Sequence, residues 1–122
     1  MGLRMAIGVG TITLLVAACG GGGSSVQAPS EDGVLRITSY DRQDYDADAY
    51  EAQAGTVRFE FSQVGVQEHT LLVEGLEEQM RLVVVDGNTD TGSLDLPPGR
   101  YILYCDIAGH RASGMEARLT VN

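Results

Sequence analysis

The sequence predicts an all-β domain, a Greek-key β-sandwich of about seven to eight strands. Apolar and polar residues alternate in short segments, turn residues separate these segments, and no stretch of helical period is long enough to bury one face. The chain has 122 residues, of which 43% are hydrophobic. That length and composition are sufficient for one compact core.

Three segments show the alternation most clearly, because every second residue in them is apolar. Their apolar positions are Leu35 and Ile37; Val57, Phe59 and Phe61; and Ala117, Leu119 and Val121. Each segment has one apolar and one polar face, as in antiparallel sheets packed over a core. Further strands are expected at residues 69–74, 80–85, 92–96 and 100–105, with turns at Asp86-Gly87-Asn88 and Pro97-Pro98-Gly99. The acidic residues 41–51 could form a strand, a loop or a short helix.

Residues 1–18 are predicted to be a secretory signal, because Arg4 precedes an apolar run that ends in small residues. The end of this run, Leu15-Val16-Ala17-Ala18-Cys19, resembles a bacterial lipobox, which implies cleavage before Cys19 and lipid attachment to it. An uncleaved membrane helix is the alternative, although the run is short for spanning a bilayer. Residues 19–33 are rich in glycine and serine and are expected to form a flexible tether. The folded domain is expected at residues 34–122.

The chain is acidic, with a formal net charge of −9, and it contains no lysine. Removal of the signal takes away Arg4 and makes the charge about −10. We therefore expect no nucleic acid among its partners. The acidic residues 41–51 could steer a basic partner, or they could be only a solvated surface.

Cys105 is the second cysteine of the chain and has no disulfide partner if Cys19 carries lipid. Exported proteins usually pair their cysteines, so an isolated thiol in an oxidising compartment requires an explanation. It could be buried and inert, it could be a nucleophile, or it could bind a metal.

Three further side chains are expected to gather around Cys105. Strand alternation predicts that His69, Cys105 and Met115 point to the core, because each shares its face with apolar residues of its own strand. His110 lies midway in the loop between Cys105 and Met115. Two imidazoles, a thiolate and a weak axial thioether are the donors of blue-copper centres. Zinc gains little from methionine, and calcium or magnesium would prefer carboxylates. The pattern therefore predicts one copper ion that cycles between Cu(I) and Cu(II).

With these motifs, residues 34–122 resemble the cupredoxins, the small blue copper proteins related to plastocyanin and azurin. The segment LDLPPGRYILYC, which ends at Cys105, is similar to the strand and turn that lead into the copper cysteine. The spacing Cys105-x4-His110-x4-Met115 is similar to that of sulfocyanin and rusticyanin. The segment EHTLLVEG looks like the strand that brings the first histidine, with Thr70 where the family often has asparagine.

The resemblance implies that His110 lies near the surface as the port for electrons. Its neighbours Ile107, Ala108 and Ala112 would form a small apolar patch for transient docking of redox protein partners. We expect a monomer without substrate turnover, anchored to the outer face of a bacterial membrane, on the periplasmic side or the cell surface.

Two other functions remain open. A copper-binding or copper-delivery protein for the assembly of another cuproenzyme would use the same donors, although methionine-rich or histidine-rich tracts are absent from the sequence. A thiol hydrolase could use Cys105 and His110 as nucleophile and base. The hydrolase would leave Met115 without a role, and the sequence places no asparagine or aspartate to orient the histidine.

Overall fold

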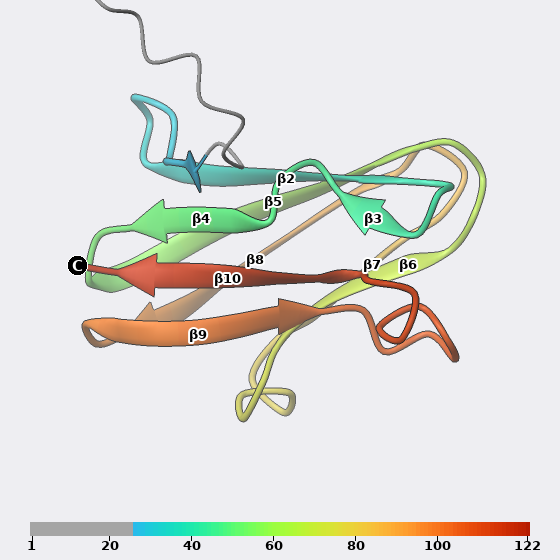
Figure 1. Cartoon of the computed structure of the whole chain (residues 1–122). Helices are drawn as coiled ribbons and strands as arrows, with labels where there is room; N and C mark the ends of the chain where they lie inside the picture. Colours follow the sequence, from blue (N-terminus) through green and yellow to red (C-terminus); the bar gives the residue numbers. More distant parts are fainter. Residues whose placement is uncertain (1–25) are drawn as a thin grey trace, which may run out of the picture.

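A computed structural model describes residues 26–122, in which ten strands account for the regular structure (Figure 1). In chain order the strands are β1 (Val26–Gln27), β2 (Val34–Tyr40), β3 (Asp44–Tyr45), β4 (Ala49–Ala52), β5 (Gly55–Val64), β6 (His69–Val73), β7 (Arg81–Val84), β8 (Thr89–Leu96), β9 (Gly99–Tyr104) and β10 (Glu116–Val121). The all-β prediction is confirmed for this part of the chain. Residues 26–122 include no helix long and apolar enough to cross a bilayer. The predicted signal and Cys19 lie outside the described residues.

The strands form two sheets that pack face to face. The larger sheet has the order β1-β4-β10-β9-β6-β7, and the smaller has the order β3-β2-β5-β8. Both sheets are mixed, because β1 and β4, β4 and β10, and β2 and β5 pair in parallel. The expected antiparallel pairing holds for the other five strand pairs and not for these three. Parallel neighbours need a crossover connection, and strand alternation carries no information about such crossovers.

The strand number exceeds the expected seven or eight because three short strands escaped the alternation pattern. The acidic segment supplies β3 and β4, whose aromatic residues Tyr45 and Tyr50 are 2% and 1% exposed. Val26 and Gln27 pair with Ala49 and Tyr50. The larger sheet therefore includes two residues of the predicted tether, residues 19–33.

The core lies between the two sheets and is built from the predicted inward faces. Leu35, Phe59 and Phe61 come from the smaller sheet, and Leu103 and Leu119 from the larger one; all five are at most 1% exposed. The alternate residues of β2, β5, β9 and β10 are intermediate or exposed, whereas β6 is buried at all five positions. The strand-face prediction is confirmed for β2, β5, β9 and β10.

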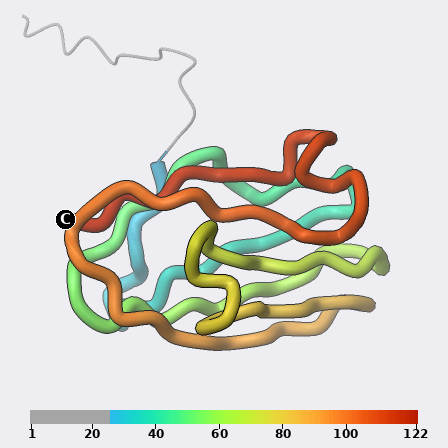
Figure 2. Tube along the Cα trace, turned by 90° about the horizontal axis from the view of Figure 1, so that it is seen from below, coloured from blue at the N-terminus to red at the C-terminus, as the bar shows by residue number. Residues whose placement is uncertain are grey.

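The predicted donor residues lie at one end of the sandwich. The loop from β9 to β10 and the loop from β5 to β6 lie at the same end in both views (Figures 1 and 2). His69 begins β6, and Cys105 follows β9 directly. The β-sheet framework thus brings chain segments that are far apart in sequence to a common edge.

Candidate metal centre

The loop from Cys105 to Met115 is closed on itself by main-chain hydrogen bonds. The amide of Cys105 donates to the carbonyl of Met115 at 3.2 Å, and the amide of Met115 donates to the carbonyl of His110 at 3.1 Å. Gly109 and Gly114 have φ angles of 82° and 109°, a backbone conformation that glycine adopts without strain. The closed loop holds Cys105, His110 and Met115 next to one another.

Three donor side chains meet at the end of the core. Ligand atoms of His69, Cys105 and His110 all lie within 4.8 Å of one another. The two Nδ1 atoms are 3.2 Å apart, and Cys105 Sγ is 3.5 Å from His110 Nδ1. Metal–imidazole bonds are about 2.0–2.1 Å long, so one ion fits between nitrogens at this separation. The convergence of these three residues is confirmed.

The cluster is almost closed to solvent. His69, Cys105 and Met115 are 0% exposed, and His110 is 5% exposed. Met115 is joined to Cys105 and His110 through its main chain, and its side chain belongs to the hydrophobic core. A buried thiol, two imidazoles and a thioether match the soft and borderline donors that copper prefers.

Thr70 ties the two donor segments together. Its Oγ1 donates to the carboxylate of Asp106 at 2.8 Å and accepts from the amide of Asp106 at 2.9 Å. Its own amide donates to Cys105 Sγ at 3.4 Å. Thr70 thus links the start of β6 to the residues that follow β9.

Arg81 holds the Asp106 carboxylate from the other side. Its Nε and Nη2 donate to the two carboxylate oxygens at 2.8 and 2.9 Å. These hydrogen bonds, with the one from the Thr70 hydroxyl, lower the pKa of Asp106 below its usual value despite partial burial. Asp106 therefore stays ionised next to the metal centre.

A second carboxylate fixes the loop that leads to His69. Asp41 accepts from the amides of Val66 and Gln67 at 3.0 and 2.9 Å, and from Gln63 Nε2 at 3.1 Å. A Cβ added to Gly65 would clash with this carboxylate, and the φ angle of 127° also favours glycine there. Asp41 thus joins the turn after β2 to the loop before β6.

The environment of His69 disfavours the imidazolium form. Burial, and then the nearby His110, lower the pKa of His69 below 6.5. The backbone of Tyr40 lies near the ring and raises the pKa by a smaller amount. The ring nitrogen Nε2 has no partner in hydrogen-bonding geometry among residues 26–122. A neutral imidazole is the form that binds metal.

The metal-free protein is therefore expected to lose stability as the pH falls below about 6.5. The unfolded chain binds a proton at position 69 in that range while the folded chain does not, so protonation favours unfolding until the pH reaches the lower folded pKa. Urea unfolding in chelator at about pH 7.5 and 5.5 measures the loss. The free energy of unfolding should depend less on pH in the variant His69→Gln. An equal change between the two pH values in both proteins would contradict the prediction.

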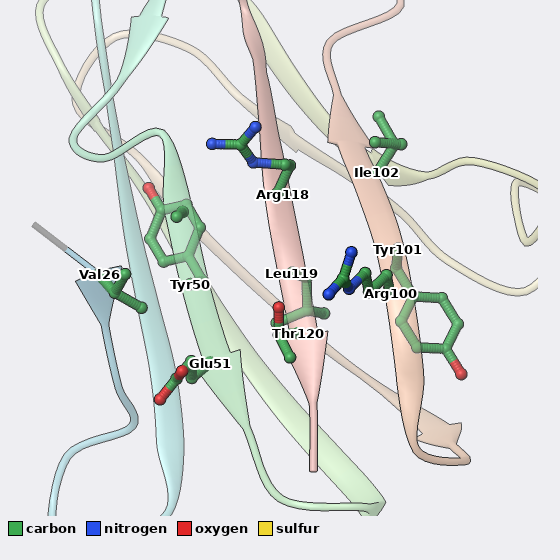
Figure 3. A pocket seen from close by; sticks show the side chains of 10 residues that line it. Val26, Tyr50, Glu51, Arg100, Tyr101, Ile102, Arg118, Leu119 and Thr120 are labelled. Atoms are coloured by element: carbon green, nitrogen blue, oxygen red, sulfur yellow. The ribbon is translucent and has the colours of Figure 1, made fainter. Parts of the chain in front are cut away.

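A shallow groove lies on the outer face of the larger sheet, over β4, β10 and β9 (Figure 3). Its lining includes Glu51 from β4, Arg118 and Thr120 from β10, and Arg100 from β9. None of the lining residues is a cysteine, histidine or methionine, so the groove contributes no donor to the metal centre.

Two mixed sheets with a buried His-Cys-His cluster and a methionine at one end define a protein of the cupredoxin class. The Sulfocyanin (SoxE) domain model matches residues 59–122, just over half of the chain. The chain belongs to the sulfocyanin family. Its cofactor is copper, and His69, Cys105, His110 and Met115 are the donor set that fits one such ion.

Solved structures agree with this fold. Reduced auracyanin from the photosynthetic bacterium Roseiflexus castenholzii is 19% identical, with a TM-score of 0.64 over 82% of this chain and 99% of auracyanin. Reduced rusticyanin is 16% identical, with a TM-score of 0.60 over 80% and 84%. Auracyanin A, a "blue" copper protein from Chloroflexus aurantiacus, is 19% identical, with a TM-score of 0.58 over 80% and 100%. No curated protein sequence matches the chain significantly.

Sequence reasoning identified the four donors but missed the residues that hold them. Asp41, Arg81 and Asp106 were assigned no role in the site. Arg81 and Asp106 are 25 residues apart, and Asp41 and Val66 are also 25 apart. The sequence carries no local signal for contacts at such separations, although the position of Asp106 directly after Cys105 could have drawn attention to it.

Proposed function

We propose that the protein is a one-electron carrier that is tethered to the outer face of a bacterial membrane through Cys19. The observation that carries the proposal is the buried cluster in which the Nδ1 atoms of His69 and His110 face each other at 3.2 Å beside Cys105 Sγ. Copper, when bound, supplies the redox couple between Cu(I) and Cu(II), with a reduction potential typical of a copper site that has a thiolate ligand.

Each donor residue has a distinct role in this proposal. Cys105 binds as thiolate, His69 and His110 supply neutral nitrogens, and Met115 is the weak axial donor. The β-sheet framework keeps the donors in place in both oxidation states, which reduces reorganisation during electron transfer. Burial of Cys105 and Met115 at 0% exposure excludes water from the sulfur atoms.

The loop around His110 is the proposed contact surface for redox partners. Ile107, Ala108 and Ala112 line a shallow hollow beside Cys105. His110, at 5% exposure, is the most accessible of the four donors. A small apolar surface of this kind suits weak and transient complexes, as a carrier with a donor and an acceptor requires.

Addition of one equivalent of Cu(II) to the purified protein tests the proposal. We expect an intense thiolate-to-copper absorption band in the visible region, bleached by a one-electron reductant and restored by an oxidant. The band should survive ordinary concentrations of chelator, because the donors are buried. Rapid transfer of copper to the chelator would favour a delivery protein, and absence of the band would refute the carrier.

Replacement of Met115 by leucine is expected to raise the reduction potential while copper remains bound. The axial thioether stabilises Cu(II) more than Cu(I), and leucine removes it at similar volume. Potentiometric titration of the visible band measures the change. Met80→Leu is the matched control, because Met80 is a core methionine at 6% exposure outside the donor cluster. Equal potentials in wild type and Met115→Leu would argue against axial ligation.

Substitution of Cys19 is expected to release the protein from membranes. The variant Cys19→Ala has no thiol for lipid attachment, so the protein should move from the membrane fraction to the soluble fraction. Ser24→Ala, a change within the same predicted tether, should stay in the membrane fraction. If Cys19→Ala also stays there, an uncleaved N-terminal helix is the anchor.

A further inference from the structure

The Thr70 hydroxyl lies within reach of two acceptors. Thr70 Oγ1 is 2.8 Å from Asp106 Oδ1 and 3.4 Å from Cys105 Sγ. The same oxygen accepts a hydrogen bond from the amide of Asp106 at 2.9 Å. The hydroxyl has only one proton, so it donates either to the carboxylate or to the sulfur.

The carboxylate is the stronger of the two acceptors. An O–H donor to an ionised carboxylate forms a charge-assisted bond, roughly twice as strong as a neutral one. The 2.8 Å separation is a usual length for an O–H···O hydrogen bond, whereas sulfur at 3.4 Å is a weak acceptor. Thr70 Oγ1 therefore donates its hydrogen bond to Asp106, and Cys105 Sγ keeps the amide of Thr70 as a donor.

Arg81 fixes the direction in which the Asp106 carboxylate points. The fork of its Nε and Nη2 spans both carboxylate oxygens at 2.8 and 2.9 Å. The oxygen that receives Nη2 is the same Oδ1 that receives the Thr70 hydroxyl. The Asp106 side chain is 32% exposed, whereas Thr70 is fully buried. An ion pair near the surface is thus one hydrogen bond away from a buried hydroxyl beside Cys105 Sγ.

We propose that Asp106, held by Arg81, is a positioning residue that draws the Thr70 hydroxyl away from Cys105 Sγ and thereby lowers the reduction potential of the copper centre. Hydrogen bonds to the thiolate withdraw electron density from it and favour Cu(I). Diversion of one such donor leaves more electron density on the sulfur and favours Cu(II). The inference rests on the proposed copper function and concerns how this chain sets its potential.

A double-mutant cycle on Asp106 and Thr70 tests the proposal. In Asp106→Ala the hydroxyl is free to donate to sulfur, so the potential should rise and the charge-transfer band should move to higher energy. Thr70→Val in the Asp106→Ala background should reverse part of both shifts. Thr70→Val alone should change them little. The removed charge of Asp106 affects both Thr70 backgrounds alike and cancels in the cycle.

Two further variants separate the effect of the Thr70 hydroxyl orientation from the effect of the Asp106 charge. Asp106→Asn removes the charge but keeps an oxygen acceptor for Thr70, so it should raise the potential less than Asp106→Ala and shift the band less. Asp95→Ala is the matched control, because Asp95 also accepts from a threonine hydroxyl, that of Thr56, at the opposite end of β5 from the loop that leads to His69. It should leave potential and band unchanged.

Equal shifts from Thr70→Val in both backgrounds would overturn the proposal, because they would mean that Asp106 does not direct the hydroxyl. A copper-free measurement keeps this result separate from a failure of the copper function. In the metal-free protein, the Thr70 hydroxyl proton should give a downfield NMR resonance that moves upfield in Asp106→Ala. An unmoved resonance would refute the role of Asp106 even if the wild-type protein formed a blue centre.

Discussion

Replacing Cys105 by serine is expected to abolish the visible absorption band of the copper protein completely. The band arises from charge transfer between a thiolate and copper, and a serine hydroxyl cannot supply it at neutral pH. Copper affinity should fall by more than the 10–100-fold typical of losing an outer-shell partner, because the anionic donor itself is removed. Titration with Cu(II), followed by absorbance and by bound metal, measures both effects.

The fold should survive this change, because serine is smaller than cysteine and introduces no clash, and Cys105 is one residue among many in the core. Cys19→Ser is the matched control, since it makes the same substitution outside residues 26–122. An undiminished band in Cys105→Ser would show that another residue supplies the thiolate, and the assignment of the centre would then be wrong.

Replacing Phe61 by alanine is expected to destabilise the protein by about 3–5 kcal/mol. Phe61 is 0% exposed in the centre of β5 and packs edge to face against Tyr45, with ring centroids 6.0 Å apart. The substitution loses the buried area and the aromatic contact and leaves a cavity. A domain of this size has a total stability of about 5–15 kcal/mol, so the loss is a large fraction of it.

Urea unfolding of the metal-free protein measures the loss, since copper would add its own binding energy to the folded state. Val64→Ala is the control in the same strand, because Val64 is 57% exposed, and it should change stability by less than about 0.5 kcal/mol. Similar losses for both variants would mean that Phe61 is not part of the packed interface between the sheets.

The amino-acid sequence determined the features that depend on neighbouring residues. Strand alternation has a period of two, so the inward faces of Leu103 and Leu119, and with them Cys105 and Met115, followed from local pattern alone. The identity of the donors also followed, because two imidazoles, a thiol and a thioether restrict the choice of metal. The acidic segment lacked this alternation, and its strands β3 and β4 were accordingly left open.

Only the tertiary structure decided which segments meet. The parallel pairing of β2 with β5 and of β4 with β10 depends on packing between distant parts of the chain, which local alternation does not encode. The contacts that surround the donors have the same origin: Thr70 and Asp106 are 36 residues apart in sequence and 2.8 Å apart in space. Hydrogen bonds of this kind form wherever the folded backbone brings donor and acceptor together. The sequence therefore specified the donor residues, and the fold specified the hydrogen bonds that position them.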